Sequence, residues 1–468
     1  MIWDFCKYKN NIALISEDGM VDYGQLNVMS EQICKNIPRR SLVFLLCTNT
    51  VESVVGYVCF LNHEIVPVMV DSSLNTELLL NLAKRYRPEY FWAPASMSKL
   101  FSNCEEIYAL ESYVLLRCHE RKAFSLYDEL ALLMTTSGST GSPKLVRLSY
   151  KNILANTRSI IDYLEIDEKE RSVTNLPMHY VYGLSIINTH LYAGASIVLT
   201  EKSMFQKEFW QMMREKNVTN FGGVPYTFEM LNRLRFFKME LPALKTITQA
   251  GGKLPPELHE KFADYALKNG KRFIVMYGAA EATARMGYLP PEESLRKCGA
   301  MGIPIPGGKF ILIDDNGKEI NTLDTIGELV YYGDNVMLGY AEHGEDLAKG
   351  DEAQGRLKTG DLAKFDEEGY YFVVGRKKRF LKIYGKRVNL QEVEFILQKH
   401  FDTLGIAVSG VDDLMHIFIE DINLTEDIKE YVSTKFNIHH LAIRVHDVDS
   451  IPKNSSGKIL YSKLEAMI

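Results

Sequence analysis

An apolar run that leads into a loop of small and hydroxylated residues lies between positions 131 and 144. Residues 131–133 are apolar and predict the end of a buried strand. The loop contains Thr136, Ser137, Gly138, Ser139, Thr140, Gly141, Ser142, Pro143 and Lys144. Its glycines allow backbone N–H groups to turn towards an anion, because no Cβ is in the way. With added hydroxyl donors and a lysine, this pattern predicts a polyphosphate-binding loop at a strand end.

Two other interpretations of this loop are weaker. A stretch of Ser, Thr and Gly is most often a plain surface loop. Here, however, a buried strand precedes it and a lysine follows it. A Walker A loop, G-x-x-x-x-G-K-(S/T), shares the spacing between Gly138 and Lys144. That motif has glycine before the lysine and Ser or Thr after it, whereas this chain has Pro143 and Leu145.

The length and charge of the chain limit its fold and its partners. A chain of 468 residues is too long for one simple core, so we expect two or more domains. Its hydrophobic content of 46% and charged content of 24% are ordinary for a soluble globular protein. The net charge of −6 gives no electrostatic reason to expect nucleic acid as a partner. No apolar run is long enough to predict a membrane span.

The cysteines and the N-terminus favour a cytoplasmic location. The seven cysteines form no C-x-x-C pair, so we expect no zinc site. An odd, dispersed set fits a reducing compartment better than a disulfide framework. The N-terminus lacks the basic and apolar segments of a signal peptide. We therefore predict a cytoplasmic protein without a disulfide framework.

Strand and helix patterns alternate over the first 130 residues. Residues 41–47 form a continuous apolar run typical of a buried strand, residues 51–61 have a helical pattern, and residues 65–70 are again strand-like. This spacing predicts parallel strands with helices on the faces of the sheet. The expected fold class is α/β, with a large N-terminal domain of parallel-rich sheets and flanking helices.

Two later strand candidates end in loops that contain glycine. Residues 244–249 run into Gly251 and Gly252, and residues 272–276 run into Tyr277. In an open parallel sheet, ligands bind beyond the carboxyl ends of the strands. Glycines let a flat base lie against the backbone, and a tyrosine can stack on it. These two loops therefore predict the place of a nucleotide base.

The loop at 136–144 resembles the phosphate loop of the adenylate-forming superfamily, T-S-G-(S/T)-T-G-x-P-K. That superfamily contains acyl-CoA synthetases, amino-acid adenylation domains and luciferases. Four more segments resemble its motifs in the expected order, so that the resemblance covers essentially the whole chain: 277–281 (Y-G-x-T-E), 359–361 (T-G-D), 375–388 (G-R-x-(D/K)-x-x-I-K-x-x-G-x-R-(I/V)) and 452–459 (P-K-(T/N)-x-(S/T)-G-K-(I/V)). The segment 327–340 also resembles the superfamily and is interpreted as structural. The chain departs from the pattern at Leu145, where glycine is common, and at Ala280, where a threonine normally offers its hydroxyl to phosphate.

The resemblance implies a catalytic site for ATP and Mg²⁺. It gives Glu281 the role of magnesium ligand on the phosphates, which is an ordinary magnesium arrangement. It places Lys144 with the phosphate loop and makes Lys458 the lysine that stabilises charge between the carboxylate and the α-phosphate. The expected nucleotide-binding positions are Thr136, Ser137, Gly138, Ser139, Thr140, Gly141, Gly251, Gly252, Tyr277, Gly278, Ala279, Asp361 (ribose) and Arg376 (ribose or phosphate).

The acyl pocket is expected next to residues 176–184. The superfamily pattern P-x-x-H-x-x-G places Tyr180 at the aromatic gate, with His179 one residue earlier. Amino-acid adenylation domains usually carry an aspartate in F-D-x-S, and Gly183 stands at that position here. A buried ammonium without a counter-charge costs several kcal/mol. We therefore expect an acid other than an α-amino acid, unless another acidic residue enters the pocket.

The resemblance implies two domains and two half-reactions. Residues 1–374 would form the AMP-binding domain, and residues 375–468 a small, mobile α+β catalytic domain that turns about Lys378. A small carboxylic acid would react with ATP to give acyl-AMP and pyrophosphate. A thiol of CoA, or of phosphopantetheine on a stand-alone acyl carrier protein, would then displace AMP. Two alternatives stay open: an amino-acid adenylase that loads a separate carrier protein, and a nucleotide-binding homologue with weakened catalysis, which Ala280 motivates.

Overall fold

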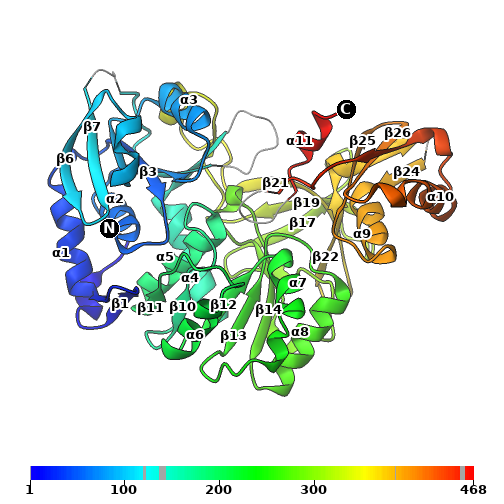
Figure 1. Cartoon of the computed structure of the whole chain (residues 1–468), viewed down its shortest axis with the longest axis horizontal. Helices are drawn as coiled ribbons and strands as arrows, with labels where there is room; N and C mark the ends of the chain where they lie inside the picture. The colour runs from blue at the N-terminus through cyan, green and yellow to red at the C-terminus, as the bar shows by residue number, and fades with distance from the viewer. Residues whose placement is uncertain (1, 120–122, 136–143, 385, 454–458) are drawn as a thin grey trace. The chain divides into compact units, whose positions relative to one another are not determined.

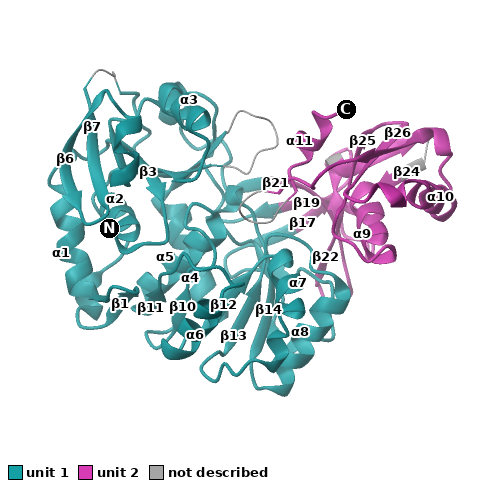
Figure 2. Ribbon diagram, viewed as in Figure 1, with its two compact units in different colours: residues 1–136, 142–310, 331–357 teal, residues 137–141, 311–330, 358–468 magenta. Residues whose placement is uncertain are grey.

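The computed structural model describes residues 2–119, 123–135, 144–384, 386–453 and 459–468 (Figure 1). The side chains at 378, 386 and 387 lie outside this description. The described residues form two compact units (Figure 2). Unit 1 contains the residues up to 310 and residues 331–357, and unit 2 contains residues 311–330 and those from 358 onward. The division follows packing, and the functional boundary predicted at residue 375 stays a prediction.

Unit 1 contains two large sheets with parallel central strands. The first has nine strands in the order β16 (Ile303–Pro304), β15 (Gly287–Tyr288), β14 (Arg272–Tyr277), β13 (Thr246–Gln249), β12 (Asn220–Gly223), β10 (Arg171–Val173), β11 (Ser196–Val198), β1 (Ile12–Ile15) and β2 (Met20–Asp22). The second has eight strands in the order β20 (Gly339–Ala341), β9 (Leu145–Ser149), β8 (Leu130–Thr135), β4 (Val66–Asp71), β3 (Leu42–Cys47), β5 (Tyr90–Pro94), β7 (Tyr113–Cys118) and β6 (Cys104–Leu110). Antiparallel strands lie only towards the edges of both sheets.

Four helices lie between the two sheets: α1 (Tyr23–Cys34), α2 (Val51–Asn62), α4 (Tyr150–Leu164) and α5 (Val181–Ala193). Helix α2 packs on β3 and β4, α4 packs on β8 and β9, and α5 packs on β10 and β11. The outer face of the second sheet is covered by α3 (Thr76–Tyr86). The outer face of the first sheet is covered by α6 (Lys207–Glu215), α7 (Pro225–Arg233) and α8 (Pro256–Lys268).

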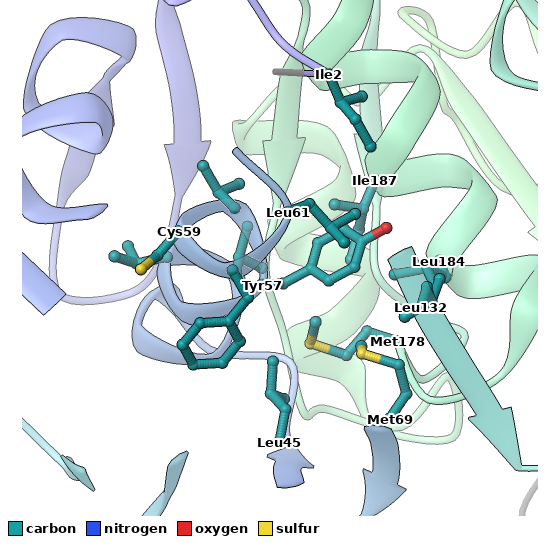
Figure 3. Packing of buried hydrophobic residues seen from close by; sticks show 14 of the residues in the cluster. Ile2, Leu45, Tyr57, Cys59, Leu61, Met69, Leu132, Met178, Leu184 and Ile187 are labelled. Atoms are coloured by element: carbon teal, nitrogen blue, oxygen red, sulfur yellow. The ribbon is translucent and has the colours of Figure 1, made fainter. Parts of the chain in front are cut away.

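The main core joins both sheets through these inner helices (Figure 3). Every residue of α2 from Ser53 to Leu61 is buried, as expected for a helix that is mainly apolar on all sides. Tyr57 of α2 lies beside Leu184 and Ile187 of α5 in this core (Figure 3). Its hydroxyl donates to Asn188 Oδ1 at 2.8 Å, which satisfies the polar end of a fully buried ring.

The structure confirms the predicted α/β class. The apolar runs at 41–47 and 65–70 form the adjacent parallel strands β3 and β4, and residues 51–61 form α2 between them in sequence. The expectation about the cysteines is wrong at one pair, because Cys104 and Cys118 form a disulfide. They face each other across the antiparallel pair β6–β7, a register that the scattered spacing of the cysteines does not reveal.

Unit 2 has the predicted α+β character at its C-terminal end. A five-stranded sheet, partly shared with unit 1 in sequence, has the order β18 (Glu319–Ile320), β17 (Lys309–Ile313), β19 (Gly327–Tyr332), β21 (Arg356–Phe365) and β22 (Tyr371–Arg376). The remaining elements are the pair β23 (Phe380–Ile383) and β24 (Lys386–Asn389), the sheet β25 (Ile406–Val411), β26 (Leu414–Ile419) and β27 (Ile443–Asp447), and the helices α9 (Leu390–His400), α10 (Thr425–Phe436) and α11 (Tyr461–Glu465). Asn389 caps α9, because its Oδ1 accepts from the N–H groups of Gln391 and Glu392.

None of the helices in the described residues combines the length and the apolar character that a membrane crossing requires.

Candidate active site

The strand pair β9–β20 brings Lys144 next to residues 340–342, which are nearly 200 residues later in the sequence. Lys144 directly precedes β9, and Tyr340 of β20 pairs with Val146 of β9. The Lys144 ammonium forms an ion pair with the Glu342 carboxylate and lies 5.7 Å from the centre of the Tyr340 ring. The hydrogen bond and charge of Lys144 hold the pKa of Glu342 below its usual range. Lys144 therefore has two defined neighbours, Glu342 and Tyr340.

Tyr340 also connects this lysine to Glu281. Glu281 lies in the 3₁₀ turn η4 (Ala280–Ala282), shortly after β14. The Tyr340 hydroxyl donates to Glu281 Oε1 at 2.7 Å, and the Met337 N–H donates to the Glu281 carbonyl at 2.9 Å. The structure thus places the two predicted catalytic residues of unit 1, Lys144 and Glu281, around one tyrosine ring.

The Glu281 carboxylate fits a magnesium ion held on phosphates. Its second oxygen, Oε2, accepts no hydrogen bond from any described residue. The described part of the chain contains no group of three or more Asp, Glu, His or Cys side chains arranged as a metal site. Magnesium is commonly held by one or two carboxylates together with substrate phosphates and water. A single half-buried carboxylate suits that arrangement.

The end of β14 is shaped by close backbone packing. Tyr277 is half-buried and lies edge-on to Phe310, with ring centres 6.2 Å apart. A Cβ at position 278 would lie 1.7 Å from the Ala284 carbonyl oxygen, so only Gly278 allows the chain to return along β14 as β15. The Thr283 hydroxyl donates to the Asn335 carbonyl at 2.7 Å. This bond uses the hydroxyl proton of Thr283. Thr283 therefore does not replace the threonine hydroxyl that the superfamily pattern has at position 280, where this chain has alanine.

The loop after β13 lies against the predicted gate. Gly251 has φ +88°, and a Cβ there would lie 2.7 Å from the Tyr180 hydroxyl. Gln249 is fully buried, and its Nε2 donates to the Gly252 carbonyl at 2.9 Å, which fixes the loop. Tyr180 and Gly251 are therefore neighbours, and the gate role of Tyr180 stays a prediction.

Gly183 lies in a tight contact at the start of α5. A Cβ at this position would lie 2.3 Å from the Pro177 carbonyl oxygen and 2.7 Å from that of Leu176. No side chain fits there on this backbone, acidic side chains included. The neighbouring His179 lies 3.5 Å from Asp71, and burial lowers its pKa despite that carboxylate.

The predicted ribose residues of unit 2 form one pair. Asp361 of β21 and Arg376 of β22 face each other in the antiparallel register, with Arg376 Nε 3.2 Å from Asp361 Oδ1. Gly360, with φ +72°, lies within β21 directly before the buried aspartate. The backbone of Lys378 lies in the 3₁₀ turn η7 (Lys377–Arg379). The following predicted site residues lie outside the described residues: Thr136, Ser137, Gly138, Ser139, Thr140, Gly141 and Lys458.

Comparison with known proteins matches this architecture to one family. The model of the AMP-binding enzyme family matches residues 3–341. The chain belongs to this family. Among its relatives, the oxalate–CoA ligase of Arabidopsis thaliana is 30% identical over 348 residues, which are 71% of this chain and 66% of that protein. The 4-coumarate–CoA ligase-like 2 of the same plant is 29% identical over 349 residues, but the match spans only 61% of its length. The first relatives are thus matched over slightly less than two thirds of their length.

Other matches span nearly the whole chain. The 2-succinylbenzoate–CoA ligase of Bacillus subtilis is 26% identical over 485 residues, which cover 97% of this chain and 94% of that protein. A solved structure of o-succinylbenzoate CoA synthetase from Bacillus subtilis, in complex with its acyl-adenylate intermediate, has a TM-score of 0.80 and 23% identity, and the match covers 98% of this chain and 97% of that one. At this identity the structural match establishes the fold.

Three residues at the site were missed by sequence reasoning. Tyr340 lies in a segment interpreted as structural, and its partner Glu281 is 59 residues away. Glu342 follows the same strand. Arg285 follows the segment 277–281 that resembles Y-G-x-T-E, but it belongs to no motif. The pairing of β20 with β9 places Tyr340 and Glu342 beside the predicted site residues, and the return of the chain along β14 places Arg285 beside Met276.

Proposed function

We propose that this chain activates a carboxylic acid with ATP and transfers the acyl group to a thiol. The substrate carboxylate attacks the α-phosphate, which gives acyl-AMP and releases pyrophosphate. A thiol then attacks the acyl carbon and displaces AMP. The observation that carries this proposal is the arrangement of Lys144 and Glu281 around Tyr340, beside the strand-end residues Tyr277 and Gly278 of an AMP-binding family member.

Each residue has a proposed part in the first half-reaction. Lys144 and the loop 136–143 hold the phosphates that leave as pyrophosphate. Glu281 would hold Mg²⁺, which supplies positive charge to the phosphate oxygens when bound. The adenine base lies against Gly251 and Gly252 and stacks on Tyr277. Lys458 stabilises the negative charge that develops between the carboxylate and the α-phosphate.

The C-terminal part serves both half-reactions in this proposal. Asp361 accepts hydrogen bonds from the ribose hydroxyls, and its ion pair with Arg376 orients the carboxylate. Residues 375–468 turn about Lys378 between the two half-reactions. CoA is the preferred acceptor, because the relatives named above are CoA ligases. The phosphopantetheine of a separate acyl carrier protein is the alternative.

Two alternative functions remain, and one position bears on each: Gly183 weighs against the first, and Ala280 motivates the second. An amino-acid adenylase needs a counter-charge for the substrate ammonium, and Gly183 leaves no room for one at its usual place. A nucleotide-binding homologue with weakened catalysis is motivated by Ala280, whose missing hydroxyl is not replaced by Thr283. We favour the acid–thiol ligase, since the loss of one hydroxyl contact corresponds to about 1 kcal/mol.

ATP–pyrophosphate exchange over a panel of carboxylic acids and amino acids tests this function. We expect carboxylic acids to drive exchange and amino acids not to do so. Lys458→Ala should reduce exchange by at least about 100-fold while ATP binding persists, because the lost charge acts only in the transition state. The exposed Lys463→Ala is the matched control and should behave as wild type. If only amino acids drive exchange, the amino-acid adenylase is favoured. If no acid of the panel drives exchange, the nucleotide-binding homologue with weakened catalysis is favoured.

A further inference from the structure

Arg285 is a buried arginine whose charge has no anionic partner among the described residues. It is 3% exposed. Its Nε lies 3.4 Å from the Met276 sulfur, and its Nη1 lies 3.4 Å from the Ala284 carbonyl oxygen. Its guanidinium carbon lies 3.9 Å from the centre of the Tyr182 ring. The guanidinium also lies beside the Tyr163 hydroxyl, which is an uncharged partner.

The other fully buried arginine of unit 1 shows how this chain normally treats such a charge. Arg147 is 0% exposed, forms an ion pair with Glu352 and donates to four backbone carbonyls. Burying a guanidinium without an anion is costly, because water no longer solvates the charge. A cation–π contact with Tyr182 offsets part of that cost, but it is weaker than a charge pair. Arg285 therefore lacks the anion that its environment requires.

The titratable groups around Arg285 do not supply this anion. Burial raises the pKa values of Tyr163, Tyr180 and Tyr182, so the three hydroxyls are neutral at physiological pH. Two further charged residues line the same cavity, and both have partners. Glu170 binds Lys245 at 3.2 Å, and Arg272 binds Glu165 at 2.6 Å.

Arg285 lines a small cavity between the first sheet and the helices α4 and α5. The cavity has a volume of about 30 Å³, which leaves room for one or two water molecules. The Tyr182 hydroxyl lies 2.7 Å from Thr248 Oγ1 and adds polar groups to its wall. The other lining residues near Arg285 are Ile160, Ser185, Gly222 and Met276. The space suits a compact polar group and excludes a long acyl chain.

Tyr182, which lines this cavity, is also a neighbour of the proposed gate residue Tyr180. The Tyr180 hydroxyl lies against Gly251, as described above, and the Tyr180 and Tyr182 ring centres are 6.4 Å apart. Tyr182 in turn stacks on Arg285. A path of direct neighbours therefore leads from the strand-end loop after β13 to the buried guanidinium, all within unit 1.

We propose that Arg285 binds a second anionic group of the acid substrate, so that the substrate is a short dicarboxylic acid. This inference rests on the proposed function. One carboxylate lies at the gate and reacts with ATP, and the other accepts hydrogen bonds from the Arg285 guanidinium in the cavity. A carboxylate offers the planar, two-oxygen geometry that a guanidinium binds best. The small cavity limits the spacer between the two carboxylates to a few carbon atoms.

Matched substrates test this proposal in the exchange assay. Malonate, succinate and glutarate are each compared with their monomethyl esters, which keep one reactive carboxylate and lose the second charge. We expect wild-type kcat/KM to favour at least one diacid over its ester by about 100-fold or more, because a buried polar site rejects a substrate that leaves it unpaired. Arg285→Met should lower kcat/KM for that diacid by about 100-fold and change the ester by less than about 3-fold.

A matched variant and a stability measurement separate this role from a structural one. Arg158→Met removes an exposed arginine from α4 and should change neither substrate. Arg285→Lys retains a charge without the planar fork and should recover part of the diacid preference. Without ligand, Arg285→Met should melt at the wild-type temperature or above it, because a buried unpaired charge is removed. If Arg285 has only a structural role, Arg285→Met should melt at a lower temperature than wild type. Its kcat/KM should then fall equally for the diacid and for the ester.

The outcomes distinguish the two proposals. If wild type uses the monoesters as well as the diacids, or if Arg285→Met and Arg285→Lys lose both substrates equally, the dicarboxylate inference is wrong and the proposed function stands. If no acid of the panel drives exchange in wild type, the proposed function is wrong, and the inference fails with it.

Discussion

Tyr340 makes two separate contacts at the candidate site, and they can be removed one at a time. Its hydroxyl donates to Glu281, and its ring lies beside the Lys144 ammonium. Tyr340→Phe removes the hydroxyl and keeps the ring. We expect the KM for MgATP to rise about 3- to 10-fold, because a partly exposed hydrogen bond to a carboxylate contributes roughly 1 kcal/mol to its orientation. Exchange rates at varied MgATP concentration measure this change.

Tyr340→Leu provides the comparison, since it removes the ring as well. The Lys144 contact should then also be lost, and the KM for MgATP should rise further than in the Phe variant. Equal KM values for wild type and both variants would show that Tyr340 positions neither Glu281 nor Lys144.

Single residues were predictable where a short motif contains them. Lys144, Glu281 and Tyr277 could be proposed from the sequence because each lies in one segment with a recognisable spacing, and their roles stay predictions. Tyr340 and Arg285 were not, because each acts through a contact between segments that are far apart in the sequence. Such contacts follow from strand pairing, and a sequence pattern gives the existence of a strand more readily than its neighbours.

At the level of elements, the start of α5 is set by one glycine. Gly183 packs directly on the backbone of residues 176–177, where rigid carbonyl groups cannot move aside as a flexible side chain could. We expect Gly183→Ala to lower the free energy of unfolding by about 1–3 kcal/mol through overpacking. Urea denaturation followed by tryptophan fluorescence measures this change.

Gly350→Ala is the matched control for that variant. A Cβ at position 350 would meet only Tyr127, at 3.7 Å, which is an ordinary contact. Its stability should therefore stay within about 0.5 kcal/mol of wild type. If the two variants are equally stable, the backbone contact at Gly183 does not constrain α5.

Elements with a clear apolar pattern were predicted well, and shorter ones were not. The run at 51–61 became α2 because a buried helix is apolar on all sides. Strand β11 is only Ser196–Val198, because Ala193 ends α5 and Gly194 adopts φ +75° as its left-handed cap. Strand β20 has three residues and is defined by its partner β9, so its own sequence carries little signal.

For the whole molecule, the parallel-rich sheets and the α+β C-terminal end followed from the order of the patterns. The packing division did not. Residues 311–330 belong with the C-terminal part because β17 and β19 join one sheet with β21 and β22. The grouping of residues 311–330 with later strands depends on the strand order of this sheet. No change in local composition marks it in the sequence. The Cys104–Cys118 disulfide was missed for the same reason, since it depends on a hairpin register.

The stability of unit 1 should fall in mild acid because two of its histidines are buried. Burial lowers the pKa values of His190 and His259 to about 4, from 6.5. His190 Nε2 accepts from the Asn220 amide at 2.9 Å, and Nδ1–H donates to the Ile186 carbonyl at 2.8 Å, which fits a neutral ring. The unfolded chain therefore binds protons below pH 6.5 that the folded chain does not bind until about pH 4.

The sign of the effect follows from this difference. Stability is fully present above pH 6.5 and decreases as the pH falls towards 4, by at most about 1.4 kcal/mol per pH unit for each histidine. The three tryptophans, Trp3, Trp92 and Trp210, all lie in unit 1, so urea denaturation followed by fluorescence reports this unit. His190→Gln should have a shallower pH dependence than wild type over this range, whereas the exposed His440→Gln should not. An unchanged slope in His190→Gln would mean that His190 is protonated in the folded state, and that the hydrogen bond from Asn220 is not made as described.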